Sequence, residues 1–324
     1  MHKKELDALR SIINTYYEID PAYDENGWSG ILCADIVVYF EGFDQSLKDN
    51  AAGILDFYNQ SMALVKNEMK WALINGEGKI RKINKKVFDM IPFWLSPEGP
   101  DGGIRGVDMQ GGPERNGRID MGFSFHHSTR SHLRLTLPVE YMLDDPQRFA
   151  NLAKAMVGRL KFATGNAGFS VNMALDGIGD DRAEDSHVYM LSRRFDGLDI
   201  GVPWDSAYYG KHGLRTINWL TFVGDDLMQR MQGRENVRAA LPPDIPVTDL
   251  EHGLMIQASP QPVLGDVNRQ ERPDDYYRVG RALQPLALQL PAILDPETTR
   301  VEGYGSRIGG HDNTERWCKR FFKA

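Results

Sequence analysis

The stretch Ile119-Asp-Met-Gly-Phe-Ser-Phe-His126 decides the fold together with the stretch that follows it, His132-Leu-Arg-Leu-Thr-Leu-Pro138. Both are strand-like in residue type. The polar residues 127–131 between them are long enough for a reversal of the chain, so the two runs predict an antiparallel hairpin. A hairpin of this kind indicates a sheet in which neighbouring strands are joined locally.

Outward from this hairpin, strands alternate with amphipathic helices. Residues 31–40 predict a strand followed by a helix to about residue 67, and strand–helix units recur over 31–66, 132–163 and 254–285. Strands that occur both in hairpins and in strand–helix units are typical of an α+β protein. We therefore expect mainly antiparallel sheets flanked by helices. The recurring strand–helix units also suggest that the chain arose by duplication of such a unit.

The length of 324 residues suggests about two domains, or one large one. The polar loop 176–186 is the expected boundary, which gives subdomains 1–175 and 176–324, with one continuous domain as the alternative. Residues 96–117 are rich in glycine and proline and are predicted to form a long loop. Pro92 is expected to end a short helix that begins at Lys85.

Composition points to a cytoplasmic protein. The chain has only two cysteines, Cys33 and Cys318, no signal-like apolar segment at its start and no apolar run of the length that a spanning helix needs. The formal net charge is −7. An acidic chain is a poor partner for nucleic acid or an anionic membrane, so neither is expected as a direct partner.

Catalytic chemistry has one candidate place in the sequence. Alternate residues of a strand share a face, so Asp120, Ser124 and His126 would lie together, with His127 beside them. Such a group could bind a metal or act as a base, which leaves a metal-dependent hydrolase as an alternative function. The spacing matches no zinc motif, and the chain has no nucleophile elbow or phosphate loop. We therefore predict no catalytic residue, no metal and no cofactor.

Two features suggest a surface that binds another protein. Residues 176–185 hold five acidic side chains against the single Arg182, and such a loop could occupy a cationic groove or be an ordinary solvated connector. Aromatic residues that follow could anchor an interface or pack in the core. The candidate binding residues are Asp176, Asp180, Asp181, Glu184, Asp185, Trp204, Tyr208 and Tyr209.

Several segments taken in order carry a family resemblance. They are Phe93-Trp-Leu-Ser-Pro97 with the glycine-rich loop after it, Asp120-Met-Gly-Phe-Ser-Phe-His-His127, Asn218-Trp-Leu-Thr-Phe222, Gly265-Asp-Val-Asn-Arg269, and Tyr277-Arg278. Together they resemble the type VI secretion immunity family, the TsiV-like proteins. The resemblance covers roughly residues 30–310.

The resemblance implies an antidote rather than an enzyme. A member of this family would bind a cognate effector toxin, mostly a nuclease, encoded by an adjacent gene, and would cover its active site or substrate groove. The resemblance implies no catalytic residues for this chain. The shared segments are expected to be determinants of the fold: buried aromatic residues, turn glycines and helix caps. A structural accessory protein of the secretion system is the remaining alternative.

Overall fold

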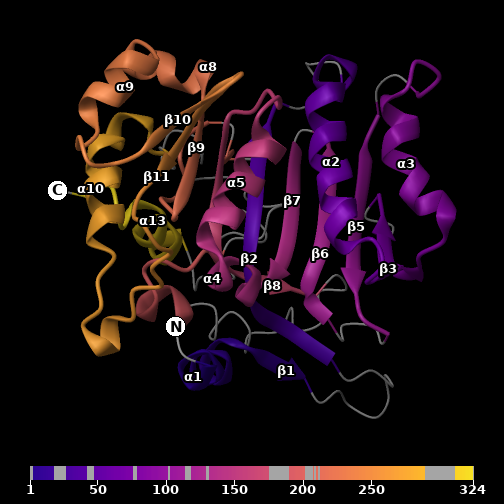
Figure 1. Cartoon of the computed structure of the whole chain (residues 1–324), viewed down its shortest axis with the longest axis horizontal. Coiled ribbons are helices and arrows are strands. Elements are labelled where there is room, and N and C mark those ends of the chain that lie inside the picture. The colour runs from indigo at the N-terminus through magenta and orange to yellow at the C-terminus, as the bar shows by residue number, and fades with distance from the viewer. Residues whose placement is uncertain are drawn as a thin grey trace.

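In the computed structural model, one antiparallel sheet organises the molecule (Figure 1). The structure describes residues 3–17, 27–41, 47–75, 79–100, 103–113, 118–128, 131–174, 190–200, 207, 209–210, 212–288 and 311–323. The strands of the sheet are β1 (Thr15–Tyr17), β2 (Gly27–Phe40), β3 (Met69–Ile74), β4 (Arg81–Lys82), β5 (Arg105–Gly111), β6 (Arg118–His127), β7 (Ser131–Pro138), β8 (Thr164–Met173), β9 (Leu220–Gly224), β10 (Val247–Leu250) and β11 (Gly253–Gln257).

The strands lie in the order β10-β11-β9-β8-β2-β7-β6-β5-β3-β4, with β1 paired to β2. The hairpin predicted from the sequence is confirmed: β6 pairs antiparallel with β7, and His126 lies opposite His132. The expected α+β class with antiparallel pairing is also confirmed. The sheet continues across the expected boundary at residue 176, because β8 pairs directly with β9, and the division into two subdomains stays a prediction.

Helices cover one face of the sheet. Figure 1 shows α2, α3 and α5 in front of the strands, with α1 at the lower end and α8, α9, α10 and α13 gathered beside β9, β10 and β11. The described helices are α1 (Lys3–Ile13), α2 (Ala51–Val65), α3 (Lys85–Leu95), α4 (Val139–Asp144), α5 (Pro146–Val157), α8 (Asp225–Met228), α9 (Arg234–Ala240), α10 (Asp274–Ala282) and α13 (His311–Lys319). Among the described residues, no helix combines the length and apolar character required to cross a bilayer.

The core lies between these helices and the apolar face of the sheet. Alternate residues of β6 point toward the helices, so Phe123 packs edge-on against Tyr58 of α2, and Phe125 packs against Trp94 of α3. Phe149 of α5 stacks on Trp219 just before β9. These aromatic contacts join segments that are far apart in the sequence into one apolar layer.

The helix α3 extends past the point that the sequence predicted. Pro92 was expected to end it, but the helix continues through Pro92 to Leu95. A proline lacks the N–H that would bond the carbonyl four residues earlier. Here that carbonyl, on Phe88, accepts a hydrogen bond from the hydroxyl of Tyr58 at 2.6 Å. The tertiary contact compensates for the missing helical bond.

The predicted loop 96–117 was also wrong in its second half. Residues 105–111 form β5, which pairs with β3 on one side and β6 on the other. The partner strand β3 lies far back in the chain, and the glycine- and proline-rich residues around β5 hid its strand character in the sequence. This strand carries Asp108 into the interior of the sheet.

Candidate functional site

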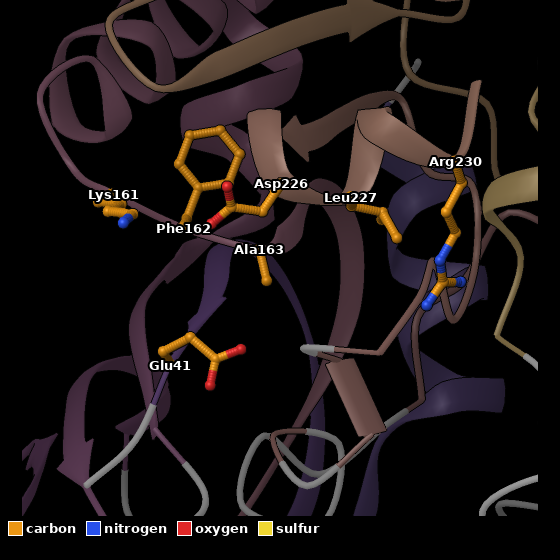
Figure 2. A pocket seen from close by; sticks show the side chains of 7 residues that line it. All are labelled: Glu41, Lys161, Phe162, Ala163, Asp226, Leu227 and Arg230. Atoms are coloured by element: carbon orange, nitrogen blue, oxygen red, sulfur yellow. The ribbon is translucent and has the colours of Figure 1, made fainter. Parts of the chain in front are cut away.

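A small hollow lies at the surface between β2 and α8 (Figure 2). Its volume is about 130 Å³, and Glu41, Lys161, Asp226 and Arg230 contribute charges of both signs. Sites for small organic ligands usually measure about 300 Å³ or more and are mostly apolar. Size and mixed charge therefore do not favour this hollow as a substrate site.

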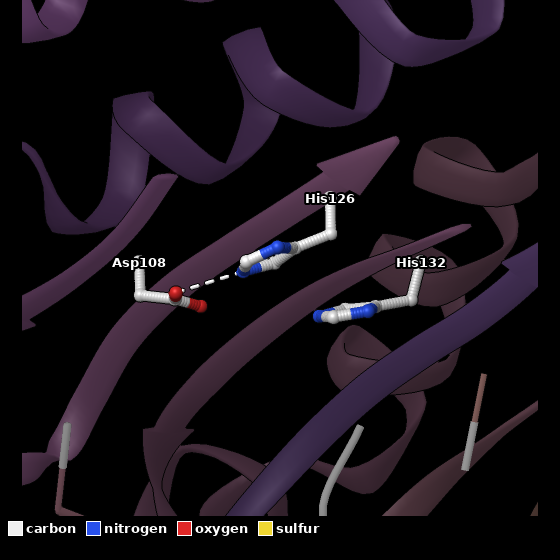
Figure 3. Close-up of side chains that lie close together, drawn as sticks. All are labelled: Asp108, His126 and His132. Atoms are coloured by element: carbon white, nitrogen blue, oxygen red, sulfur yellow. Dashed lines mark hydrogen bonds and ion pairs between the residues drawn. The ribbon is translucent and has the colours of Figure 1, made fainter. Parts of the chain in front are cut away.

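A more specific arrangement lies on the sheet face opposite α2 and α3. Three adjacent strands bring Asp108, His126 and His132 together (Figure 3). His126 Nε2 lies 2.8 Å from Asp108 Oδ2, and the two imidazole rings stack with their centroids 4.9 Å apart. Ser124 completes the group, because its hydroxyl lies 2.5 Å from Asp108 Oδ1 and 2.8 Å from His132 Nε2. We call these four residues the histidine cluster.

The environment of the cluster sets its protonation. Burial opposes ionisation of Asp108, but the charge and hydrogen bond of His126 and the hydrogen bond from Ser124 outweigh it and lower the pKa of the carboxyl. Burial and the neighbouring His126 hold the pKa of His132 well below its usual value. At neutral pH the cluster thus contains a carboxylate beside a neutral His132.

The cluster does not have the geometry of a nucleophilic triad. In a Ser-His-Asp triad, the histidine nitrogen remote from the serine donates to the carboxylate. Here the remote nitrogen of His132 is buried without a hydrogen-bond partner among the described residues, and Asp108 contacts Ser124 and His126 instead. The serine is therefore held in place rather than activated.

The residues of the hydrolase alternative are only partly brought together. His126 and Ser124 belong to the cluster, but Asp120 bonds Arg118 at 3.2 Å. His127 follows His126 and points to the other face of β6, where its Nδ1 lies 3.5 Å from the Ser131 hydroxyl. The sequence prediction missed Asp108 and His132. A consistent hairpin register would have found His132, since it lies as far beyond the 127–131 turn as His126 lies before it.

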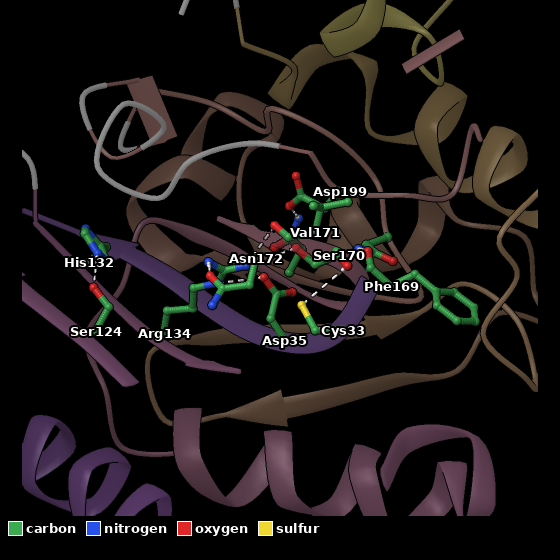
Figure 4. A network of polar contacts seen from close by, with 12 residues as sticks. Cys33, Asp35, Ser124, His132, Arg134, Phe169, Ser170, Val171, Asn172 and Asp199 are labelled. Atoms are coloured by element: carbon green, nitrogen blue, oxygen red, sulfur yellow. Dashed lines mark hydrogen bonds and ion pairs between the residues drawn. The ribbon is translucent and has the colours of Figure 1, made fainter. Parts of the chain in front are cut away.

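A buried ion pair adjoins the cluster on the same face (Figure 4). Arg134 of β7 donates to Asp35 of β2 at 2.9 Å, and its other nitrogens bond Asn172 and Ser170 of β8 at 2.5 and 3.2 Å. Burial raises the pKa of Asp35, although Arg134 acts in the opposite direction. The guanidinium thus joins three strands from inside the sheet.

A second buried pair anchors the C-terminal helix. Arg215 bonds Asp199, which also accepts from Asn166 of β8 at 2.7 Å. The guanidinium of Arg215 lies 5.0 Å from the ring of Trp317 in α13, and that of Arg320 lies 4.1 Å from the same ring. Trp317 is only 2% exposed. The terminal aromatic residues therefore pack on the body of the protein.

Both cysteines are buried rather than exposed at the surface. Cys33 is fully buried in β2, where its Sγ lies 3.4 Å from the Ser170 carbonyl and burial raises the pKa of the thiol. Cys318 is buried in α13. Both positions fit structural roles in the core.

The candidate binding residues fall mostly outside the described part of the chain. This holds for Asp176, Asp180, Asp181, Glu184, Asp185, Trp204 and Tyr208. Tyr209 is described, and it is 2% exposed and belongs to the main core cluster. Its position fits the core-packing role that the sequence left open beside the role of an anchor.

The segments that carry the family resemblance have structural roles where they are described. Trp219 donates its indole N–H to the Ser259 carbonyl at 2.8 Å inside the core. Gly265 has a φ of +70°, and Asp266 caps the short helical turn Val267–Arg269 by accepting from the Asn268 amide at 3.0 Å. Buried aromatic residues, a turn glycine and a cap therefore occur as expected.

Comparisons with known proteins give two findings. A family model described as "Type VI immunity for VRR-NUC" (TsiV) matches residues 116–321. Among solved structures, the chain is similar to the Pseudomonas aeruginosa T6SS protein PA0821, with a TM-score of 0.73 and 18% sequence identity. That similarity covers 98% of this chain and 90% of the other, and at this identity it shows a shared fold. No curated protein matches the chain.

The family match spans well over half of the chain and includes β6, β7, the Asn218–Phe222 segment and the Asp266 turn. It agrees with the resemblance drawn from the sequence, and it does not favour a hydrolase or an accessory component of the secretion machinery. The chain belongs to the TsiV family of type VI immunity proteins for VRR-NUC.

Proposed function

We propose that this protein protects a bacterial cell by binding its cognate VRR-NUC effector directly and blocking the nuclease. The match to the immunity family over residues 116–321 carries the proposal. An immunity protein acts by recognition, so it needs a stable surface rather than a reactive centre. The sheet, whose strands are linked by buried ion pairs such as Arg134–Asp35, provides such a scaffold.

The acidic segment 176–185 and its flanks are the proposed contact region. In the sequence this segment lies between the Met173 end of β8 and the helical residues that are described from Met190 onward. Met190 is 62% exposed. Val267, which is 48% exposed, follows Asp266, and Asp266 accepts two hydrogen bonds from Arg194 in that helical segment. Methionine is enriched in protein interfaces, so this apolar border suits a contact surface.

Charge supports the choice of partner. The chain carries a formal net charge of −7, and the segment 176–185 concentrates five acids. A nuclease that binds DNA presents cations along its substrate groove. Opposite charges accelerate association and favour the groove as the place of contact. We therefore propose steric occlusion of the active site or substrate groove as the inhibitory mode, with Trp204 and Tyr208 as additional anchors.

The proposal includes a compartment and a gene arrangement. An inhibitor of an enzyme that cleaves DNA is needed where the chromosome lies, so we place the protein in the cytoplasm. Its two cysteines are buried and are not joined in a disulfide, which is compatible with a reducing compartment. We expect the effector gene to lie beside the gene of this chain, since a cell that makes the toxin needs both products together.

Co-expression tests the function. The VRR-NUC effector encoded at the same locus is induced in a bacterial host with this chain or with an empty vector. The expected result is rescue of growth and an intact chromosome only with the chain, whereas an effector of another class remains toxic. Killing that continues despite confirmed expression of the chain would refute the proposal.

A second experiment tests the mode of inhibition. A catalytically inactive effector that still binds DNA is mixed with labelled duplex DNA, and the chain is then added. Occlusion predicts that DNA is released as the protein complex forms at one equivalent. A stable ternary complex of DNA, effector and chain would exclude occlusion and leave binding itself intact.

A further inference from the structure

We propose that Asp108, His126 and His132 form a binding site for one divalent transition-metal ion of the zinc type. Each residue offers one ligand atom, and the three atoms lie within 4.8 Å of one another. No other described group of three such residues does so. The metal-site proposal does not rest on the proposed effector surface.

The distances suit a small ion after a modest adjustment. Zinc binds nitrogen and oxygen at about 2.0–2.2 Å, which places neighbouring tetrahedral ligands roughly 3.3–3.6 Å apart. His126 Nε2 and Asp108 Oδ2 lie 2.8 Å apart. The two most distant of the three ligand atoms lie within 4.8 Å of each other. Ligand shifts of about 1 Å would bring all three atoms to bonding distance.

The sheet fixes the ligands from three adjacent strands. His126 lies directly opposite His132 on one side and Gly106 on the other. A Cβ at Gly106 would approach His126 Nδ1 to 2.6 Å, so the imidazole occupies the space that a side chain would fill. Glycine at this position thus permits the ring to lie flat across β5, beside the carboxylate of Asp108.

Ser124 has the position of a supporting residue. Its hydroxyl contacts both Asp108 and His132, and partners of this kind orient the ligands of a metal site. Its hydroxyl oxygen could also serve as a fourth ligand of the ion. Two imidazole nitrogens with one carboxylate form a donor set typical of zinc and of neighbouring transition metals, whereas calcium and magnesium prefer oxygen ligands alone.

Access and burial are graded across the site. The side chain of Asp108 is 17% exposed and that of His126 is 9% exposed, whereas His132 as a whole is 1% exposed. An ion can therefore enter past Asp108 and reach the buried imidazole. The remote nitrogen of His132, buried without a hydrogen-bond partner among the described residues, marks a polar group that the fold retains at some cost. A bound ion would join β5, β6 and β7 through their side chains.

The test uses the full chain without an affinity tag, treated with chelator and exchanged into metal-free buffer. Cobalt(II) is added first, because its visible absorption reports tetrahedral nitrogen and oxygen ligands, and zinc is then titrated against a chromophoric chelator. The expected result is one equivalent bound, a cobalt spectrum that zinc abolishes, and a thermal midpoint raised by the added metal. Failure of the wild-type chain to bind one equivalent would overturn the proposal.

Variants distinguish this site from adventitious binding. Asp108→Asn and His126→Ala are each expected to weaken zinc affinity at least tenfold and to abolish the cobalt spectrum. His252→Ala is the matched control, since His252 is a partly exposed histidine outside the cluster. Circular dichroism checks that each variant is folded. Unchanged affinity in a folded Asp108→Asn variant, or equal losses in the His252 control, would show that the cluster is only a hydrogen-bonded group.

Discussion

Arg134 on β7 and Asp35 on β2 form an ion pair, 2.9 Å from Nε to Oδ2, that is buried inside the sheet. The two side chains are 6% and 3% exposed. Sheets with one solvated face carry polar residues there because water pairs with them. In this protein the polar face is itself covered, so its charges have to pair with one another.

Removal of Arg134 alone is expected to destabilise the fold strongly. Arg134→Met leaves Asp35 as an unpaired buried charge, for which we predict a loss of about 3–5 kcal/mol in the free energy of unfolding. The double variant Asp35→Leu/Arg134→Met should lose less than the single variant, because no charge remains buried. Urea denaturation measures both.

The matched control is an exposed pair of the same type. Arg159 and Asp56 lie 3.1 Å apart with side chains 60% and 36% exposed. Arg159→Met is expected to change the free energy of unfolding by less than about 1 kcal/mol. Similar losses for Arg134→Met and Arg159→Met would contradict the structural role of the buried pair.

Asp266 predicts a stability difference that depends on pH. Burial opposes its charge, but hydrogen bonds from Arg194 and from the Asn268 amide lower the pKa of the carboxyl in the folded state. A lowered folded pKa stabilises the protein above the unfolded value near 3.8, and this contribution disappears as the pH falls through the folded pKa. Asp266→Asn should therefore cost about 1–3 kcal/mol at pH 7.

The same comparison at acidic pH checks the sign. Denaturation of the wild type and Asp266→Asn is followed from pH 7 down to the acid limit of folding. The difference between their free energies of unfolding should be constant at neutral pH and should decrease below about pH 4. A difference in the free energy of unfolding that grows in acid would show that the ionised carboxylate of Asp266 is not the form that stabilises the fold.

Alanine substitutions at Gly265 and Gly233 distinguish the cost of backbone strain from the cost of a steric contact. Both have positive φ, +70° and +103°. An added Cβ at Gly265 would lie 2.7 Å from Pro273 Cδ, but nothing lies within 4 Å of one at Gly233. Backbone strain costs about 1–3 kcal/mol at either position. Gly265→Ala should destabilise the protein more than Gly233→Ala, because only the Cβ at Gly265 also meets Pro273. Thermal unfolding compares them, and equal losses would exclude the contact with Pro273.

The sequence predicts the central hairpin and the fold class because these depend on local patterns. Alternating apolar residues in 119–126 and 132–138, with a short polar turn between them, define strands and their register. The strand β5 was not predicted, since its pairing with β3 is non-local and the glycine- and proline-rich residues on either side of it resemble a loop. Asp108 was missed for that reason, although Val107 and Met109 alternate with polar residues as in a half-buried strand.

The site could be predicted only in part. Face sharing along β6 correctly placed Ser124 and His126 together, but it also suggested Asp120, which bonds Arg118 instead. The burial of the polar face follows from long-range packing of Asp199, Arg215 and α13, and no local pattern reports it. Family membership, by contrast, was visible in the order of short segments, because these encode turns, caps and core aromatic residues.

The acidic segment predicts a kinetic effect on binding. Neutralising Asp180, Asp181, Glu184 and Asp185 as Asn or Gln should slow association with the effector about tenfold or more at low salt and reduce the salt dependence of the rate. Stopped-flow or surface-based kinetics measures it. The control neutralises Asp7, Glu68, Glu98 and Glu235, which are exposed elsewhere and remove the same charge. Equal slowing by both sets would assign the effect to net charge alone.

Titration of DNA cleavage tests direct inhibition of the effector by the chain. Purified effector cleaves a DNA substrate while the purified chain is titrated into the reaction at concentrations far above the expected Kd. We expect that cleavage falls linearly and ends at one equivalent of the chain, while an unrelated nuclease is unaffected. Cleavage that persists at a tenfold excess of the chain would contradict direct inhibition of the effector.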